Sequence, residues 1–212
     1  QMLAGERLPY EEPDLEQISI RIRPRWVVFA VDTSGSMSGQ KMQNAKQALI
    51  QTARQLLAMG GDTCRIGVVG FSREAEVICL PTSDLGKLEK AVNNLQPTGT
   101  TSMDEGIELA VQVVLAAPAG ADRDVVMLTD GMPDQDKRSR TLQIANSVQG
   151  KGITLSSLGI GKQDVDLNFL QTLTPLSLVI ESTGNISEAL GQLLTQSAKN
   201  RGAITDVDPG VP

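Results

Sequence analysis

VVFAVDTSGSM, residues 27–37, is the segment from which the expected architecture of the chain follows. Five apolar residues lead directly into Asp32, and threonine, serine and glycine come next. An unbroken apolar run of this length is typical of a parallel strand that is covered on both faces of its sheet. The polar residues after it are then expected at the carboxyl edge of that sheet, where open α/β folds bind their ligands.

Short apolar runs and amphipathic segments alternate along the rest of the chain. The predicted strands are 26–32, 64–72, 75–83, 124–131, 153–161 and 177–181. The predicted helices are 41–59, 84–95, 104–117, 138–150, 166–173 and 187–199. Too few residues separate 64–72 from 75–83 for a crossover, so these two strands must pair antiparallel. We therefore expect an α/β fold with a doubly wound, mostly parallel sheet, one antiparallel edge strand and helices on both faces.

The two ends of the chain differ from this pattern. Residues 1–17 are acidic, contain two prolines and are predicted to form an extended leader. ISIRIRP, residues 18–24, alternates apolar and polar side chains and suggests an additional edge strand. A single domain is expected over 18–200, and 201–212 lack any periodicity, which predicts a disordered tail.

Composition excludes several classes of function. The chain of 212 residues has a formal net charge of −6, which disfavours binding to nucleic acid and to anionic membranes. It contains no histidine, so Ser-His-Asp hydrolysis is excluded and a zinc site is disfavoured. No apolar stretch approaches the roughly 18–20 residues of a membrane span.

The two cysteines are expected to be free thiols. A hairpin that turns near Arg73 and Glu74 would place Cys79 opposite Val68 and away from Cys64. Buried free thiols and the lack of a recognisable signal peptide favour a cytoplasmic protein, and the acidic surface led us to expect a bacterial one.

Three polar clusters fall at predicted strand ends or at the start of a helix. Asp32, Ser34 and Ser36 follow the first strand, Thr100 and Thr101 precede the helix at 104–117, and Asp130 ends the strand VVMLT. All of their side chains offer oxygen, the ligand that Mg²⁺ prefers. The sequence therefore predicts a cation site with a coordination position left for a carboxylate from outside.

These motifs resemble those of von Willebrand factor type A domains. DTSGSM fits the family's DxSxS signature, TGTTSMDEGI is similar to its central threonine loop, and LTDG to its last aspartate motif. Thr101 is preferred to Thr100 because it stands where the family's GGT pattern ends. The resemblance implies a complete metal ion-dependent adhesion site formed by Asp32, Ser34, Ser36, Thr101 and Asp130.

The resemblance also implies a function. Members of the family bind Mg²⁺, with Mn²⁺ or Ca²⁺ as alternatives, and use it to capture a Glu or Asp side chain of a protein partner. We accordingly expect a protein-binding module and no enzyme. Two alternatives stay open: a Mg²⁺-dependent phosphotransfer enzyme with Asp32 as nucleophile, and a subunit that docks onto an AAA+ ATPase, as in the metal chelatases.

Two further predictions concern the neighbourhood of the site. Ser102 to Glu105, SMDE, matches a capping box that would open the helix after the threonine loop. Asp104, Asp134 and Asp136 also lie near the predicted site, and we interpret them as solvated surface acids in preference to a second cation site.

Overall fold

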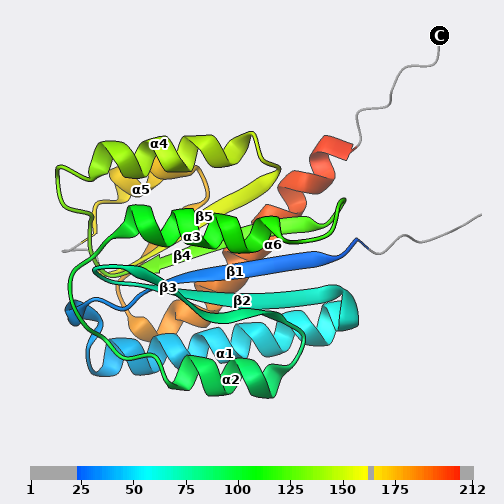
Figure 1. The fold of residues 1–212 in the computed structure, drawn as a ribbon, viewed down its shortest axis with the longest axis horizontal. Helices are drawn as coiled ribbons and strands as arrows, with labels where there is room; N and C mark the ends of the chain where they lie inside the picture. The colour runs from blue at the N-terminus through cyan, green and yellow to red at the C-terminus, as the bar shows by residue number, and fades with distance from the viewer. Residues whose placement is uncertain (1–22, 162–164, 206–212) are drawn as a thin grey trace, which may run out of the picture.

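The computed structural model describes residues 23–161 and 165–205, which form one α/β unit (Figure 1). Its strands are β1 (Arg25–Asp32), β2 (Cys64–Phe71), β3 (Ala75–Thr82), β4 (Asp122–Thr129), β5 (Ile153–Ile160) and β6 (Ser177–Ile180). Its α-helices are α1 (Gln40–Gly60), α2 (Leu85–Asn93), α3 (Met103–Leu115), α4 (Arg138–Gln149), α5 (Leu167–Leu173) and α6 (Ile186–Thr205). Every strand and helix predicted for these residues is present.

The six strands form one sheet in the order β3-β2-β1-β4-β5-β6. All neighbouring strands pair parallel except β2 and β3, which pair antiparallel through a short turn. The predicted fold class is therefore confirmed. Val68 is the partner of Cys79 in this hairpin, as expected, and both cysteines are buried free thiols.

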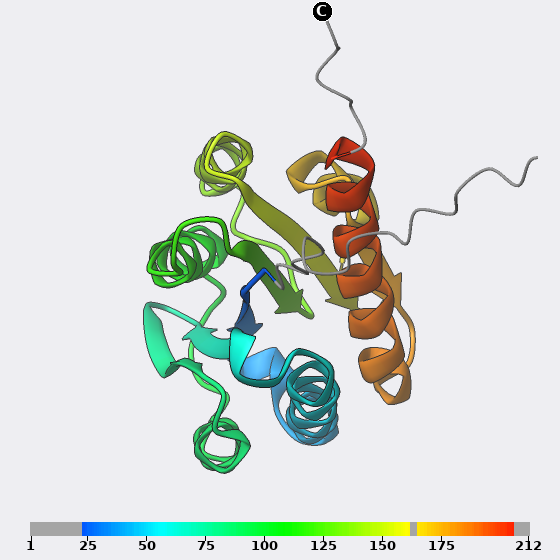
Figure 2. The same ribbon diagram turned by 90° about the vertical axis from the view of Figure 1, so that its right-hand side faces the viewer.

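The central strand β1 is covered on both faces by helices (Figure 2). Val27, Phe29 and Val31 contribute to a core with α1, α2 and α6, whereas Val28 and Ala30 contribute to a second core with α3, α4 and α5. Strand side chains alternate between the two faces of a sheet, so an apolar run is what a strand between two such layers requires. Aliphatic residues dominate both cores.

The ends of the domain depart from the sequence prediction in one respect. Helix α6 continues to Thr205, beyond its predicted end at 199 and beyond the domain end expected at 200, and Arg201 contacts Asp124 near the start of β4. The predicted leader, most of the predicted extra strand at 18–24, and residues 206–212 lie outside the described residues.

Candidate functional site

The order in which the chain adds strands to the sheet reverses between the parallel neighbours β1 and β4. From β1 the chain proceeds outward to β2 and β3, and it then returns to β4 on the other side of β1 before it reaches β5 and β6. In open α/β sheets such a switch point leaves a crevice at the carboxyl ends of the two strands. Asp32 ends β1 and Asp130 directly follows β4, so both carboxylates lie at this crevice.

A chain of hydrogen bonds links the two carboxylates. The Ser34 amide donates to Asp32 Oδ1 at 2.8 Å, and the hydroxyls of Ser34 and Ser36 lie 3.0 Å apart. The Ser36 hydroxyl donates to Asp130 Oδ1 at 2.7 Å. The short 3-10 helix Gly35–Met37 turns the backbone here and brings both serines to the same side. Four of the five predicted site residues are thereby in direct contact with another member of the set.

Asp32 is also held from the neighbouring strand. Thr129, the last residue of β4, donates its hydroxyl to Asp32 Oδ2 at 2.7 Å and accepts a hydrogen bond from the Gly131 amide. Both Asp32 oxygens therefore have protein donors, and the side chain is fully buried. Sequence reasoning missed Thr129, although its position beside Asp130 in LTDG could have suggested a supporting role.

The loop with Thr101 is tied to the loop after β1. Thr98 donates its amide to the Thr33 carbonyl at 2.6 Å, and the Gly35 amide donates to the Gly99 carbonyl at 3.1 Å. Gly99 has a φ of 75°, a conformation that side chains with a Cβ rarely adopt. Thr101 is half-buried, and its Oγ1 lies 3.8 Å from the point where a Cβ on Gly131 would lie. The fifth predicted residue thus lies next to Gly131, the residue that follows Asp130.

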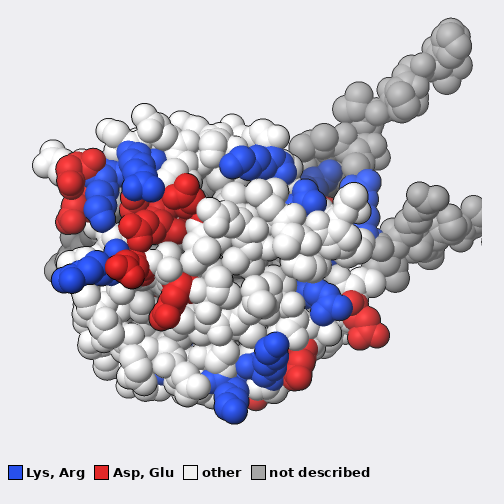
Figure 3. Space-filling view, in the orientation of Figure 1, with Lys and Arg blue, Asp and Glu red and all other residues white. Residues whose placement is uncertain are grey.

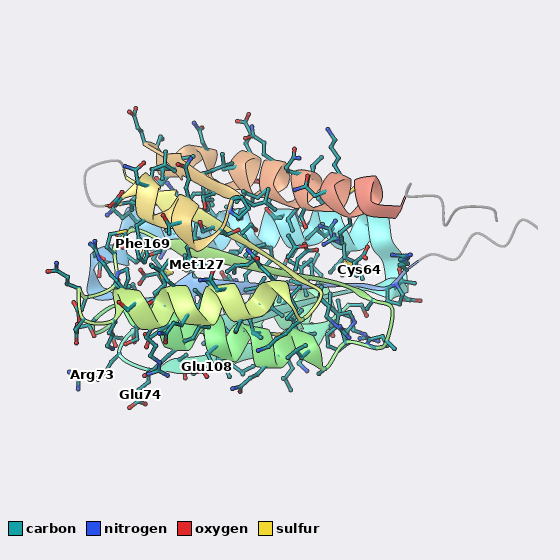
Figure 4. The ribbon with its side chains drawn as sticks, turned by 90° about the horizontal axis from the view of Figure 1, so that it is seen from above. Cys64, Arg73, Glu74, Glu108, Met127 and Phe169 are labelled. Carbon is teal, nitrogen blue, oxygen red and sulfur yellow. The ribbon has the colours of Figure 1, made fainter. Side chains whose placement is uncertain are left out.

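The predicted capping box at Ser102 is wrong. Ser102 does precede α3, but its hydroxyl donates to the Arg73 carbonyl at 2.9 Å and accepts from Lys137 Nζ at the same distance. Its amide donates to the Ser72 carbonyl. Ser102 therefore fastens the threonine loop to the turn of the β2–β3 hairpin, from which Arg73 and Glu74 project away from the body of the domain (Figure 4).

The positive charges close to Asp32 and Asp130 do not fully balance the negative charges of these two carboxylates. Burial raises the pKa of Asp32 above its usual 3.8, and the like charge of Asp130 adds to this effect, while hydrogen bonds from Ser34 and Thr129 oppose it. Asp32 has no Lys or Arg within ion-pair distance among the described residues. Asp130 has one such partner, Lys41, whose Nζ lies 2.6 Å from Asp130 Oδ2. Sequence reasoning did not identify Lys41.

The donor set suits a hard divalent cation. Two carboxylates and three hydroxyls supply oxygen alone, which favours Mg²⁺ or Mn²⁺ over zinc. No three acidic, cysteine or histidine side chains converge within the described part of the chain. Of the residues that the structure describes, only Asp32 and Asp130 would therefore be charged ligands of a cation at this place.

The three additional acids do not behave alike. Asp134 and Asp136 are exposed, as expected. Asp104 is only 1% exposed, so its interpretation as a solvated acid is wrong. Its Oδ2 lies 3.4 Å from Arg140 Nη1 of α4, and its position in the first turn of α3 suits a negative charge. Arg140 also pairs with Glu108, so Asp104 belongs to the contact between α3 and α4.

Neither cysteine is placed for catalysis. Burial raises the pKa of both the Cys64 and the Cys79 thiol, which disfavours the reactive thiolate. Cys64 lies at the end of the sheet opposite to the hairpin turn (Figure 4).

The five residues lie at an open edge. Ser36 is exposed, whereas Asp32, Ser34 and Asp130 are buried beneath it. A groove of about 720 Å³ runs elsewhere, between β6 and α6, and includes none of the five. On the face drawn in Figure 3, basic and acidic side chains intermingle near one end and form no continuous basic surface. No helix in the described ranges has both the length and the apolarity to cross a bilayer.

Comparison with known proteins agrees with the motifs. The family model of the von Willebrand factor type A domain matches residues 27–183. Inter-alpha-trypsin inhibitor heavy chain H4 from Homo sapiens is 29% identical over 164 residues, which are 71% of this chain and 17% of that protein. Heavy chain H1 from Bos taurus is 30% identical over 76% of this chain and 18% of that protein. The chain thus spans under a fifth of these curated relatives.

The fold also recurs in solved structures. The pilus adhesin SpaC from Lactobacillus rhamnosus GG superposes with a TM-score of 0.73 at 17% identity, over 85% of this chain and 30% of that one. This likeness concerns the fold. With the family model covering most of the chain, and with the sheet order and motifs described above, the protein belongs to the von Willebrand factor type A domain family.

Proposed function

We propose that this domain binds one Mg²⁺ or Mn²⁺ ion through Asp32, Ser34, Ser36, Thr101 and Asp130, and that it captures an acidic side chain of a protein partner. A bound cation would supply a positive centre with a coordination position open to a carboxylate from outside. The module holds its partner by this contact, and its role is recognition without turnover.

One observation carries the proposal. Hydrogen bonds connect Asp32, Ser34, Ser36 and Asp130 across the switch point of the sheet: the Ser34 amide donates to Asp32, the two serine hydroxyls are in contact, and the Ser36 hydroxyl donates to Asp130. Its outermost member, Ser36, is exposed while both carboxylates are buried. Such an arrangement offers a cation its ligands on the protein side and leaves the other side to solvent or a partner.

Each residue has a role that its surroundings support. The serine hydroxyls are neutral and turn toward one another, so they can ligate directly without adding negative charge. Asp32 is fixed by the Ser34 amide and Thr129, and it is suited to balance charge from a buried position. The backbone bonds of Thr98 and Gly99 hold the loop that presents Thr101 from the opposite side.

The phosphotransfer alternative receives less support. A nucleophilic aspartate needs a free oxygen that a substrate can reach. Asp32 is fully buried, and each of its oxygens already accepts a hydrogen bond. The second carboxylate, Asp130, is also buried and is paired with Lys41. We therefore retain the binding role.

Selection of peptides from a random displayed library tests this function. The purified domain would be exposed to the library in Mg²⁺, and bound peptides would be eluted with EDTA. We expect the eluted peptides to share a Glu or Asp, and we expect a Gln or Asn in its place to abolish binding.

Two domain variants serve as controls. Asp32→Asn and Asp130→Asn keep the shape of each side chain and remove its charge, so neither is expected to recover peptides of this class. Circular dichroism would verify that both variants are folded. Recovery of peptides that bind equally well in EDTA, or that contain no acid, would contradict the proposed function.

A further inference from the structure

Lys41 contacts the candidate site from α1. Its Nζ lies 2.6 Å from Asp130 Oδ2, while Asp130 Oδ1 accepts from Ser36. The Lys41 side chain is 34% exposed and that of Asp130 is fully buried. The ammonium group therefore reaches from the surface of the domain to a carboxylate that we have assigned to the cation.

The position of Lys41 in its helix does not explain its presence. It is the second residue of α1, and the first turn of that helix contains no acid. The amino end of a helix carries a partial positive charge, which disfavours lysine in the first turn. The contact with Asp130 is 89 residues away in sequence, so the reason for a lysine here lies at the site.

Because of the charges at the site, Lys41 is expected to affect the binding of both the divalent ion and an anion. Asp32 and Asp130 together carry two negative charges, and Lys41 balances one of them. A divalent ion bound to both carboxylates would balance them fully, and the ammonium would then leave the site with an excess of one positive charge. Such an excess attracts an anion, and it also opposes the entry of the divalent ion.

On the basis of the proposed function, we propose that Lys41 is a specificity-determining residue with two opposite effects. It competes with the divalent cation for Asp130, and it strengthens the binding of the partner's carboxylate to the loaded site. The lysine thus makes the site respond to the cation and the acidic ligand together, because the ligand relieves the charge excess that the cation creates.

A purely structural ion pair predicts something else. In that case Lys41 would stabilise the fold as the surface pair of Arg54 and Glu89 does, and its removal would leave both binding equilibria unchanged. The structural interpretation therefore predicts no change in either affinity, whereas our proposal predicts tighter binding of the metal and weaker binding of the carboxylate.

The first measurement is calorimetric titration with MgCl₂ of the wild type, Lys41→Gln and the control Lys90→Gln. Lys90 is an exposed lysine of α2, so its replacement changes net charge equally without touching the site. We expect Lys41→Gln to bind Mg²⁺ about threefold or more tightly than the wild type. Equal affinities in all three proteins would overturn the competition.

The second measurement uses a carboxylate of defined structure. N-acetylglutamate α-amide would be titrated onto each protein saturated with Mn²⁺, and the broadening of its methylene proton resonances would report binding next to the ion. We expect Lys41→Gln to bind this probe about threefold or more weakly, with Lys90→Gln like the wild type. An undiminished affinity of Lys41→Gln for the probe would overturn the assignment.

The outcomes separate this inference from the function on which it rests. If the wild type itself binds neither Mn²⁺ nor the probe, the proposed function fails and Lys41 has no such role. If the wild type binds both and Lys41→Gln matches it in both titrations, the function stands and the inference about Lys41 is wrong.

Discussion

The two ends of β4 hold their aspartates in different ways. At the start of the strand, Asp124 is buried and accepts hydrogen bonds from Arg25 at 2.9 Å, from Arg201 at 2.8 Å and from the Ser197 hydroxyl. Just after the end of the strand, Asp130 is equally buried but has serine and lysine as partners. The same strand thus begins in a balanced ion network and ends in an unbalanced one.

This difference distinguishes a stabilising ion network from the candidate site. Arg25 and Arg201 offset Asp124 and the nearby Asp122, and they join β1, β4 and α6 into one unit. Asp32 and Asp130 at the other end share the single positive charge of Lys41 among the described residues. A fold that needed only stability would not bury two carboxylates with one cation, because burial without a partner is costly.

The largest effect is expected at the balanced end. Replacement of Asp124 by Ala would leave Arg25 and Arg201 without their shared partner, and removal of one member of a buried pair costs about 3 kcal/mol or more. Urea unfolding in EDTA would show this as a lower midpoint with an unchanged slope.

A surface pair provides the reference for this prediction. Arg54 is exposed and Glu89 is half-buried at the surface, so Arg54→Ala is expected to cost less than about 1 kcal/mol. If Asp124→Ala destabilised the fold no more than Arg54→Ala does, the ion network at the start of β4 would not stabilise the contact between β1, β4 and α6 as we describe.

The opposite sign is expected at the unbalanced end. Asp32→Asn removes a charge whose burial is unfavourable, and the amide can still accept from the Ser34 amide and donate toward Thr129. In EDTA we expect the free energy of unfolding of Asp32→Asn to exceed that of the wild type, because the amide carries no charge that must be buried. Added Mg²⁺ should stabilise the wild type and not the variant.

The pH dependence of this gain follows from the raised pKa of Asp32. Below its ordinary value of 3.8 the acid is protonated in both the folded and the unfolded chain, so its charge costs nothing. The cost appears as the pH rises through the raised pKa. The advantage of Asp32→Asn in EDTA should therefore vanish in acid and be full at neutral pH, and an advantage independent of pH would point to a cause other than charge.

A smaller effect is expected in the threonine loop. Thr101→Ala removes a hydroxyl from the site, and we expect Mg²⁺ affinity to fall about fivefold, or about 1 kcal/mol. Thr100 is exposed and serves as the matched control, so Thr100→Ala should leave the affinity unchanged. Calorimetric titration would compare the two. The reverse order would show that the wrong threonine has been assigned to the site.

The sequence was sufficient to predict the strands and helices and to bring the candidate residues to one edge of the sheet, for a physical reason. The unbroken apolar run of β1 predicts a buried parallel strand, and parallel strands bring their carboxyl ends to one edge of the sheet. Asp32 and Asp130 could therefore be placed together without any knowledge of distances. The antiparallel hairpin followed from the short connection between the two strands, and the pairing of Cys79 with Val68 followed from the position of the turn.

The contacts that were missed are those between distant segments. Arg201 contacts Asp124 from 77 residues away, in a region expected to be a tail, and nothing local distinguishes it. Lys41 is the first residue of the helix predicted at 41–59, and nothing in the neighbouring sequence points to its contact with Asp130. At Ser102 a local pattern gave a wrong prediction, because the hydroxyl oxygen that would accept a backbone amide in a capping box accepts from Lys137 Nζ, and the hydroxyl donates to the Arg73 carbonyl. At such loop contacts, hydrogen bonds to residues distant in sequence replace those that the local sequence pattern predicts.

The most direct test of the central claim is the count of bound ions. Titration of MnCl₂ into the protein, with free Mn²⁺ followed by its electron paramagnetic resonance signal, would be carried out on the wild type and on the double variant Asp32→Asn, Asp130→Asn. The account predicts that the wild type removes one Mn²⁺ per chain from the free pool, that Mg²⁺ returns it, and that the double variant removes none. Equal concentrations of free Mn²⁺ in the titrations of the wild type and the double variant would contradict the account.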